Sequence, residues 1–213
     1  MNYDFFAYLS RMKYIVRWSL MRSTERENVQ EHSHMTAVLA HALGLIRRDV
    51  FGADCDADAL AAAALYHDAP EILTGDLPTP IKYHSRSIQS AYDEVELEAV
   101  EKLLSGLPEA LRPAYRALLT APRRAGEYTL VKAADTLAAY IKCVEERRAG
   151  NREFLSAEAA SREKLLAMEL PEVTYFLDHF LPSFEKNLDE LETLNSSVTL
   201  EGDVSLRSVT QRG

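Results

Sequence analysis

The spacing of apolar residues constrains the fold of this chain more than any other feature. Apolar side chains recur at three- and four-residue steps along most of the 213 residues, whereas the alternation typical of half-buried strands is scarce. Only 8 glycines interrupt this pattern. We therefore predict an all-α fold, a single helical bundle within residues 1–195, followed by a polar and mobile tail at 196–213 that carries no aromatic residue.

Capping residues, prolines and glycines delimit seven predicted helices. Asn28 and Glu31 form a capping-box pattern at the start of the second helix, whose inward stripe is expected to include Met35. Three prolines and a glycine make residues 69–82 a broken segment. The last helix is expected to kink at Pro182. The predicted helices cover residues 5–16, 28–48, 58–68, 87–104, 129–148, 152–167 and 171–194.

The charge balance narrows the range of partners. The chain has 24 lysines and arginines against 33 aspartates and glutamates, a net charge of −9. Nucleic acids and membrane surfaces bind cationic footprints, so we expect neither as a partner, whereas a local basic cluster still suits a small anionic substrate. No apolar run reaches the roughly 18 residues of a membrane helix. Two cysteines and the lack of a signal pattern predict a cytoplasmic protein.

Four ionisable residues fall at core-facing positions, where such groups are costly unless something satisfies them. They are two histidines and two aspartates from three predicted helices: His32, His67, Asp68 and Asp135. Two imidazoles and two carboxylates that converge in this way form a set that a borderline divalent cation would neutralise. The pattern therefore indicates a metal site.

Each of these residues also has a purely structural interpretation. An inward histidine such as His32 is often a hydrogen-bonded core residue. Asp68 could cap a short helix, because Asp68-Ala-Pro-Glu71 matches a capping box. Asp135 could pair with an arginine or lysine from elsewhere in the fold. Each interpretation explains one residue, whereas a metal explains all four.

Four stretches of the sequence resemble a known family: RWSLMR (17–22), ENVQEHS (27–33), LYHDAPEILTGDLPTPIKY (65–83) and VKAADTLAAYIKCVEE (131–146). They are similar, in matching order over roughly residues 4 to 190, to the YfbR-like 5′-deoxynucleotidase branch of the HD-domain metal-dependent phosphohydrolases. The resemblance implies an HD-domain bundle, a homodimer, and hydrolysis of 2′-deoxyribonucleoside 5′-monophosphates to deoxynucleoside and inorganic phosphate.

The resemblance also implies roles for individual residues. The metal ligands would be His32, His67, Asp68 and Asp135, holding one divalent ion such as Co²⁺ or Mn²⁺ in vitro. Glu71 would take a proton from the attacking water, although it could instead cap a helix. Pro70 departs from the small polar residue expected before that glutamate and could tilt it.

On the substrate side, the family pattern assigns the phosphate to Arg17 and a wall beside the sugar to Trp18. Otherwise Arg17 would be a solvated charge and Trp18 a core residue. Asp76 would accept a hydrogen bond from the 3′-hydroxyl, or belong to an ordinary turn. The substrate-binding set implied by the resemblance also contains Thr79, Pro80, Ile81 and Lys82, together with His32, Asp68 and Asp135.

Two other functions fit parts of the pattern. An HD hydrolase could act on a nucleoside triphosphate or a cyclic nucleotide, although a triphosphate favours more basic residues than Arg17, Arg22 and Lys82 supply. A non-catalytic helical module could hold a structural metal, which predicts a closed site without need of Glu71. Phe176, Phe180 and Phe184 of the last helix could form the dimer interface or pack on the core of their own chain.

Overall fold

The computed structural model describes residues 2–82, 84–121 and 128–195, and the expected tail at 196–213 lies outside them. Over these ranges the chain is helical and contains no β-strand, apart from one isolated bridge between Val16 and Asn28. The prediction of an all-α fold is confirmed. None of the helices in these ranges has both the length and the apolar character needed to cross a membrane.

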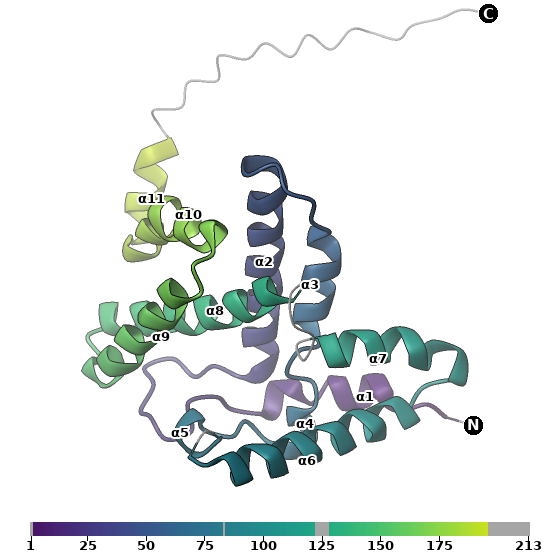
Figure 1. The fold of residues 1–213 in the computed structure, drawn as a ribbon. Helices are drawn as coiled ribbons and strands as arrows, with labels where there is room; N and C mark the ends of the chain where they lie inside the picture. Colours follow the sequence, from purple (N-terminus) through teal and green to yellow (C-terminus); the bar gives the residue numbers. More distant parts are fainter. Residues whose placement is uncertain (1, 83, 122–127, 196–213) are drawn as a thin grey trace, which may run out of the picture.

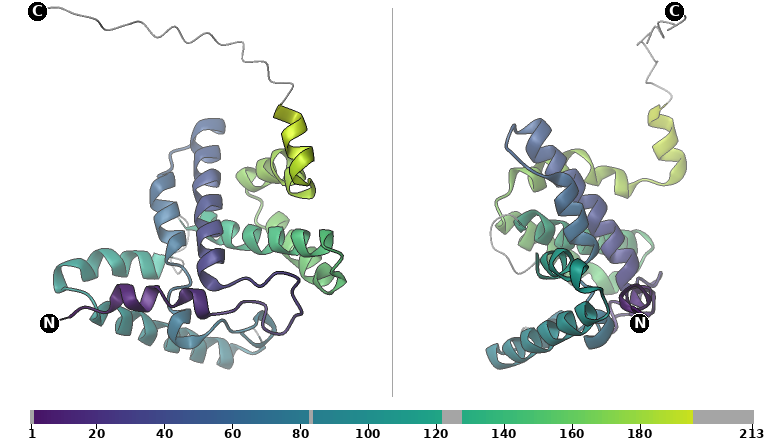
Figure 2. Two further views of the ribbon diagram at one scale, coloured as in Figure 1. Left: turned by 180° about the vertical axis from the view of Figure 1, so that it is seen from behind. Right: turned by 90° about the vertical axis from the view of Figure 1, so that its right-hand side faces the viewer.

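Two antiparallel helices, α2 and α3, form the centre of the fold, and α8 packs against both (Figure 1). Figure 2 shows α1, α6 and α7 gathered at one end of this pair. Short 3₁₀ or π turns adjoin several helices. The α-helices are α1 (Phe5–Leu9), α2 (Val29–Leu45), α3 (Ala57–Leu65), α4 (Glu71–Thr74), α5 (Thr79–Lys82), α6 (Arg86–Ser105), α7 (Arg112–Thr120), α8 (Thr129–Arg148), α9 (Leu155–Ala167), α10 (Pro171–His179) and α11 (Leu188–Asn195).

The start of α2 follows from the sequence. The side chain of Asn28 accepts a hydrogen bond from the Glu31 amide at 3.0 Å, and the Glu31 carboxylate accepts one from the Asn28 amide at 3.1 Å. This reciprocal pair satisfies two amides that the first helical turn cannot use. The capping box predicted from the sequence is therefore confirmed, and it fixes the first turn of α2.

The buried side chains form two apolar clusters. The larger contains residues of α2, α3, α8, α9 and α10, and the smaller is built mainly from α1, α6 and α7. Ala64 near the end of α3 belongs to the first cluster and Ala69 to the second. Residues 65–68 therefore join the two halves of the core, so both halves hold this segment in place.

A glycine brings α2 and α3 close together. A Cβ atom added at Gly44 would lie 2.8 Å from the Cβ of Ala57 and 3.2 Å from a methyl carbon of Leu60. Neither distance leaves room for a side chain without movement of the first turns of α3. Gly44 therefore sets the separation of the two central helices at the end where the connection from α2 to α3 runs.

Three local predictions are wrong. Met35 is 37% exposed, because the buried arc of α2, against which α3 and α8 pack, is centred on the side of Thr36 and Leu43. The expected first helix ends at Leu9, and a 3₁₀ turn over Met12–Tyr14 follows it. The expected last helix is not a kinked rod but three pieces, since the 3₁₀ turn Leu181–Glu185, which contains Pro182, separates α10 from α11.

Candidate metal centre and active site

The two histidines reach the site from different local structures. His32 lies in the first turn of α2 and is fully buried. His67 and Asp68 follow α3, which ends at Leu65, so they lie in the turn that leads to α4 and not in the helix predicted over 58–68. A turn can present two consecutive side chains to the same site, whereas consecutive residues of a helix point about 100° apart.

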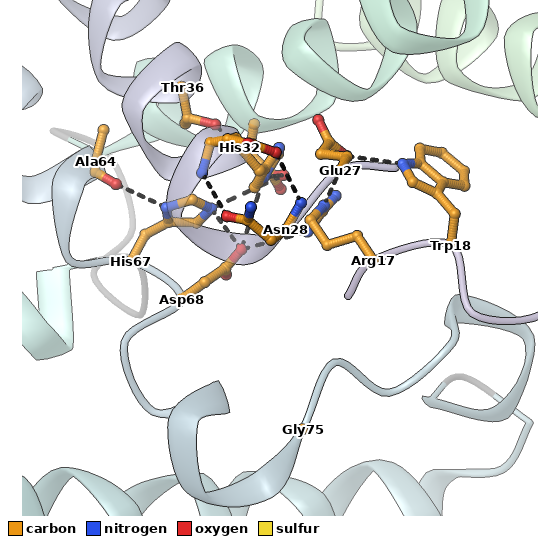
Figure 3. Close-up of polar contacts among 12 residues, drawn as sticks. Arg17, Trp18, Glu27, Asn28, His32, Thr36, Ala64, His67, Asp68 and Gly75 are labelled. Atoms are coloured by element: carbon orange, nitrogen blue, oxygen red, sulfur yellow. Dashed lines mark hydrogen bonds and ion pairs between the residues drawn. The ribbon is translucent and has the colours of Figure 1, made fainter. Parts of the chain in front are cut away.

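Asp135, in the N-terminal half of α8, completes the cluster. Its Oδ1 lies 3.1 Å from the Nε2 of His32 and 4.0 Å from the Nε2 of His67. The Oδ2 of Asp68 lies 3.0 Å from the Nε2 of His67 and 3.6 Å from the Nε2 of His32. Figure 3 shows His32, His67 and Asp68 with these polar atoms turned toward one another.

Three of these residues, His32, His67 and Asp135, offer ligand atoms that all lie within 4.8 Å of one another, whereas Asp68 falls outside this group although it lies 3.0 Å from the Nε2 of His67. Nitrogen and oxygen ligands bind zinc-like ions at about 2.0–2.2 Å, so two ligand atoms of one ion lie no more than about 4.4 Å apart. The Nδ1 of His67 lies 2.7 Å from the carbonyl oxygen of Ala64, which can only accept, so Nδ1 carries the proton. The Nε2 of His67 is buried and faces the Oδ2 of Asp68 at 3.0 Å, and it would present a lone pair to a cation that displaces its proton.

The two carboxylates make the cluster attractive to a cation. Burial raises the pKa of Asp68, but His67, His32 and Arg17 lower it to about 2. The pKa of Asp135 is held well below its usual range by the same two histidines, against the effect of burial. The two aspartates, in turn, outweigh burial and raise the pKa of His67 to about 9. Both carboxylates are ionised at neutral pH, and a divalent cation would supply the charge that they attract.

Arg17 and Trp18 lie beside the cluster. The Nη1 of Arg17 donates to the Oδ2 of Asp68 at 3.4 Å, and its side chain is 12% exposed. Burial lowers the pKa of Arg17, but Asp68 and Glu27 outweigh it, so the pKa rises further above its usual value. Trp18 is half-buried, with its ring centroid 5.3 Å from that of Phe154. Arg17 is therefore not the solvated charge that the sequence left as an alternative.

Glu71, the first residue of α4, is buried and 7% exposed. Its Oε2 has no hydrogen-bond partner within the described residues. Burial, reinforced by Asp68 and Asp76, raises the pKa of Glu71 to about 10. Asp76 follows Gly75, which has a φ of +75°, and burial also raises the pKa of Asp76. Two further carboxyl groups, Glu71 and Asp76, thus lie close enough to the cluster for the charge of Asp68 to raise their pKa values.

Comparisons with known proteins identify the family of this chain. The family described as 5′-deoxynucleotidase YfbR-like matches residues 4–184. The chain belongs to this family. A 5′-deoxynucleotidase of Vibrio vulnificus (strain YJ016) is 47% identical over 188 residues, which are 88% of this chain and 97% of that protein. A 5′-deoxynucleotidase of Erwinia tasmaniensis is 47% identical over the same length.

Solved structures show the same fold in other HD-domain proteins. An HD-domain phosphohydrolase of Listeria innocua has a TM-score of 0.76 and 26% identity, and the match covers 91% of this chain and 95% of that chain. An HD phosphohydrolase of cyanophage S-2L, solved with dA and one catalytic Zn²⁺ ion, has a TM-score of 0.56 and 20% identity, covering 85% and 96% of the two chains. The bundle of this YfbR-like chain is therefore an HD-domain fold.

The remaining residues suggested by the family pattern lie on α5, at the edge of the site. Thr79, Pro80 and Ile81 are exposed, while the backbone of Ile81 is held by a hydrogen bond to the carbonyl of Pro78 at 2.8 Å. The Nζ of Lys82 lies 3.1 Å from the Oε1 of Glu96 and 4.5 Å from the centroid of the Tyr92 ring. Along the chain, these four residues directly follow the loop that carries Asp76.

Two structural interpretations left open by the sequence find no support. The Asp68 side chain does not cap α4, whose N-cap residue is Pro70 and which has no side-chain cap. Asp135 forms no ion pair with a lysine or arginine of the described ranges. Both carboxylates instead contact histidines of the cluster.

Sequence reasoning missed one residue at this YfbR-like site. Glu27 contacts both Arg17 and Trp18, yet its only sequence signal is its position directly before the capping box of α2. A charged residue before a helix is usually solvated, so the pattern alone does not distinguish Glu27 from any other surface glutamate. Only the fold reveals that Arg17 and Glu27 lie side by side.

Proposed function

We propose that this protein hydrolyses 2′-deoxyribonucleoside 5′-monophosphates to deoxynucleoside and inorganic phosphate, with one divalent metal ion. Membership of the YfbR-like 5′-deoxynucleotidase family supports this function. The observation that carries it is the cluster of His32, His67, Asp68 and Asp135, whose facing nitrogen and oxygen atoms lie 3.0–4.0 Å apart.

The four residues of the cluster would hold the ion through two imidazole nitrogens and two carboxylate oxygens. The ion would act as a Lewis acid toward the phosphate and make water a better nucleophile near neutral pH. The family resemblance favours Co²⁺ or Mn²⁺ in vitro. His67 is already oriented for this role, because its Nδ1 donates to the Ala64 carbonyl.

Other side chains would act on the substrate directly. Arg17 uses its Nε and one Nη1 hydrogen for Glu27 and Asp68, so its remaining terminal N–H groups are available to orient a phosphate. Glu71 would accept the proton of the attacking water at its unpartnered Oε2, once a bound cation offsets the charges that raise its pKa. Trp18 would crowd a 2′-hydroxyl.

The loop and helix after α4 would complete the substrate site. Asp76 would accept a hydrogen bond from the 3′-hydroxyl of the sugar. Thr79, Pro80, Ile81 and Lys82 of α5 would cover the ligand, which the exposure of the first three leaves them free to do. A phosphate bound to the ion would also contact the residues that hold the ion, among them His32, Asp68 and Asp135.

A substrate panel tests the proposal. Purified protein with Co²⁺, Mn²⁺ or Zn²⁺ is assayed for phosphate release from deoxyribo- and ribonucleoside monophosphates, a triphosphate and a cyclic nucleotide. We expect activity on the deoxyribonucleoside monophosphates and little on the others. Preference for the triphosphate or cyclic nucleotide would assign a different HD hydrolase activity. No release from any compound by folded, metal-loaded protein would favour the non-catalytic module.

Metal binding is tested separately by thermal unfolding and elemental analysis. A ligand that binds only the folded state at 100 times its Kd stabilises it by about 2.7 kcal/mol, so the preferred ion should raise the Tm measurably. Asp135→Asn should lose this shift and the bound ion. An Asp58→Asn control, changing an exposed aspartate away from the cluster, should keep both.

We also infer a cytoplasmic homodimer whose HD domain spans residues 1–195 and which binds neither nucleic acid nor membranes. The net charge of −9 supports the absence of nucleic acid and anionic membrane partners. Phe176 and Phe184 pack in or against the core of their own chain, whereas Phe180 is 46% exposed and available to a second copy. Light scattering of the purified protein would reveal a dimer or a monomer.

A further inference from the structure

One carboxylate oxygen connects the two residues beside the metal cluster. The Oε2 of Glu27 accepts a hydrogen bond from the Nε of Arg17 at 3.1 Å and another from the indole Nε1 of Trp18 at 2.8 Å (Figure 3). The Glu27 side chain is 14% exposed, so water competes weakly for this oxygen. Bonds between charged or polar donors and a shielded carboxylate are stronger than those between neutral groups.

Glu27 itself is held by the backbone. The amide of Arg17 donates to the carbonyl of Glu27 at 3.0 Å, and the amide of Val29 donates to the carbonyl of Ile15 at 2.9 Å. These bonds pair the two ends of the loop over residues 18–26. The residue after Glu27 is the N-cap of α2, the helix that carries His32. The Glu27 carboxylate is therefore anchored to the same helix as the candidate metal site.

The backbone of Trp18 needs such an anchor. Its φ is +59°, in the left-handed region that bulky side chains rarely adopt. Residues in this conformation persist only where their surroundings hold them, and they concentrate at functional sites. Here the indole is held at its N–H by Glu27 and at its ring by Phe154. Loss of the Glu27 contact would leave one side of the ring unsupported.

We propose that Glu27 is a positioning residue that sets the selectivity of the site for a 2′-deoxyribose. A single oxygen binds both the indole of Trp18 and the guanidinium of Arg17. The distance between the indole, which faces the sugar, and the guanidinium, which binds the phosphate, is therefore fixed. This inference rests on the proposed function, which assigns the phosphate to Arg17 and the sugar to Trp18. A fixed wall excludes a 2′-hydroxyl, whereas a mobile one yields to it.

Three variants test the role. Glu27→Ala removes the shared acceptor, Glu27→Gln keeps an acceptor oxygen without the charge, and Glu25→Ala is a matched control that removes an exposed glutamate two residues away. Steady-state kinetics with paired deoxyribo- and ribonucleoside monophosphates gives kcat and KM for each. Emission and acrylamide quenching of Trp18, the only tryptophan in the chain, report on its surroundings.

For Glu27→Ala we expect KM for the deoxyribonucleotide to rise about tenfold and the ratio of kcat/KM between deoxyribo- and ribonucleotide to fall about tenfold. The Trp18 emission should shift to the red and become more accessible to the quencher. Glu27→Gln should lie between Glu27→Ala and wild type in all three readouts. Glu25→Ala should match wild type.

Contrary results would overturn the inference. An unchanged selectivity ratio with normal Trp18 emission in Glu27→Ala would do so, as would an equal loss of kcat on both sugars without any change in their ratio. If Glu27→Ala unfolds, the same comparison is made with Glu27→Gln. If the wild type hydrolyses no monophosphate, the proposed function fails, and the Trp18 emission of the variants still shows whether Glu27 holds the indole.

Discussion

Two buried glutamates, Glu71 and Glu146, have opposite surroundings. Glu71 has an unpartnered Oε2, and its burial, together with the negative charges of Asp68 and Asp76, raises its pKa to about 10. Burial also raises the pKa of Glu146, but hydrogen bonds from Lys142, Thr24 and Asn151 lower it to about 2. The same side chain is thus destabilised as an anion in one region and stabilised in the other.

The hydrogen bonds of Glu146 explain the difference. Its two oxygens accept from the Nζ of Lys142 at 2.6 Å, from the amide of Thr24 at 2.8 Å and from the side-chain nitrogen of Asn151 at 2.8 Å, among other donors. This cluster binds the loop over residues 18–26 to the C-terminal half of α8. A satisfied buried carboxylate maintains structure, whereas an unsatisfied one beside other acids is available for chemistry.

The largest effect is expected at Glu71. On the proposed function, Glu71→Gln removes a proton acceptor and should lower kcat by about 10²–10⁴-fold, as for other general bases. The free energy of unfolding of the metal-free protein should change little, because a carboxyl with a pKa of about 10 is neutral at pH 7 and glutamine replaces it with another neutral group of similar size. Steady-state kinetics and urea unfolding measure the two quantities. A stability loss equal to that of a Glu146 variant would remove the contrast between the two residues.

At Glu146 the stability should change instead. Glu146→Ala leaves the buried Lys142 ammonium without its anion and frees the amide of Thr24, so we expect a loss of about 3–5 kcal/mol in the free energy of unfolding. Urea denaturation measures this loss. Glu163→Ala, which truncates an exposed glutamate on α9, is the control and should stay within about 0.5 kcal/mol of wild type. A loss at Glu146 no larger than the control would show that the cluster is not structural.

The third and smallest effect is the pH dependence of the same cluster. The folded pKa of Glu146, about 2, lies below its ordinary value of 4.5, so its contribution is fully present above pH 4.5 and is lost as the pH falls toward 2. Because each pKa unit equals about 1.4 kcal/mol, the difference in unfolding free energy between wild type and Glu146→Gln should shrink by about 2 kcal/mol from pH 6 to pH 3. A difference that is independent of pH would contradict the low pKa.

The sequence predicts the long, capped helices well. The bounds of α8 and the capping box of α2 follow from local periodicity and caps, which act within a few residues. It does not predict α7, a nine-residue helix with prolines nearby, or the division of the last helix into three pieces. Short segments have little periodicity of their own, and tertiary packing decides their conformation.

The candidate site shows the same division. The residue types of His32, His67, Asp68 and Asp135 are visible because each breaks an apolar pattern. Glu27 does not interrupt an apolar pattern. Its partners Arg17 and Trp18 lie ten and nine residues earlier, at the other end of a loop. Two of the donors to Glu146, the amides of Thr24 and Glu25, are likewise more than 100 positions away along the chain. Contacts between segments that are distant in the sequence do not affect the local spacing of apolar and polar residues, so they cannot be predicted from it.

The close contact at Gly44 has a consequence for the candidate metal site. Gly44 lies at one end of the α2–α3 pair, and the two imidazoles lie at the other. If a side chain at position 44 pushed α2 and α3 apart at this end, the distance between the two helices at the other end would change as well. A single methyl group at position 44 would therefore alter the distance between the ring nitrogens of His32 and His67, although it contacts neither ring. The size of the ion that these nitrogens could bind would change with that distance.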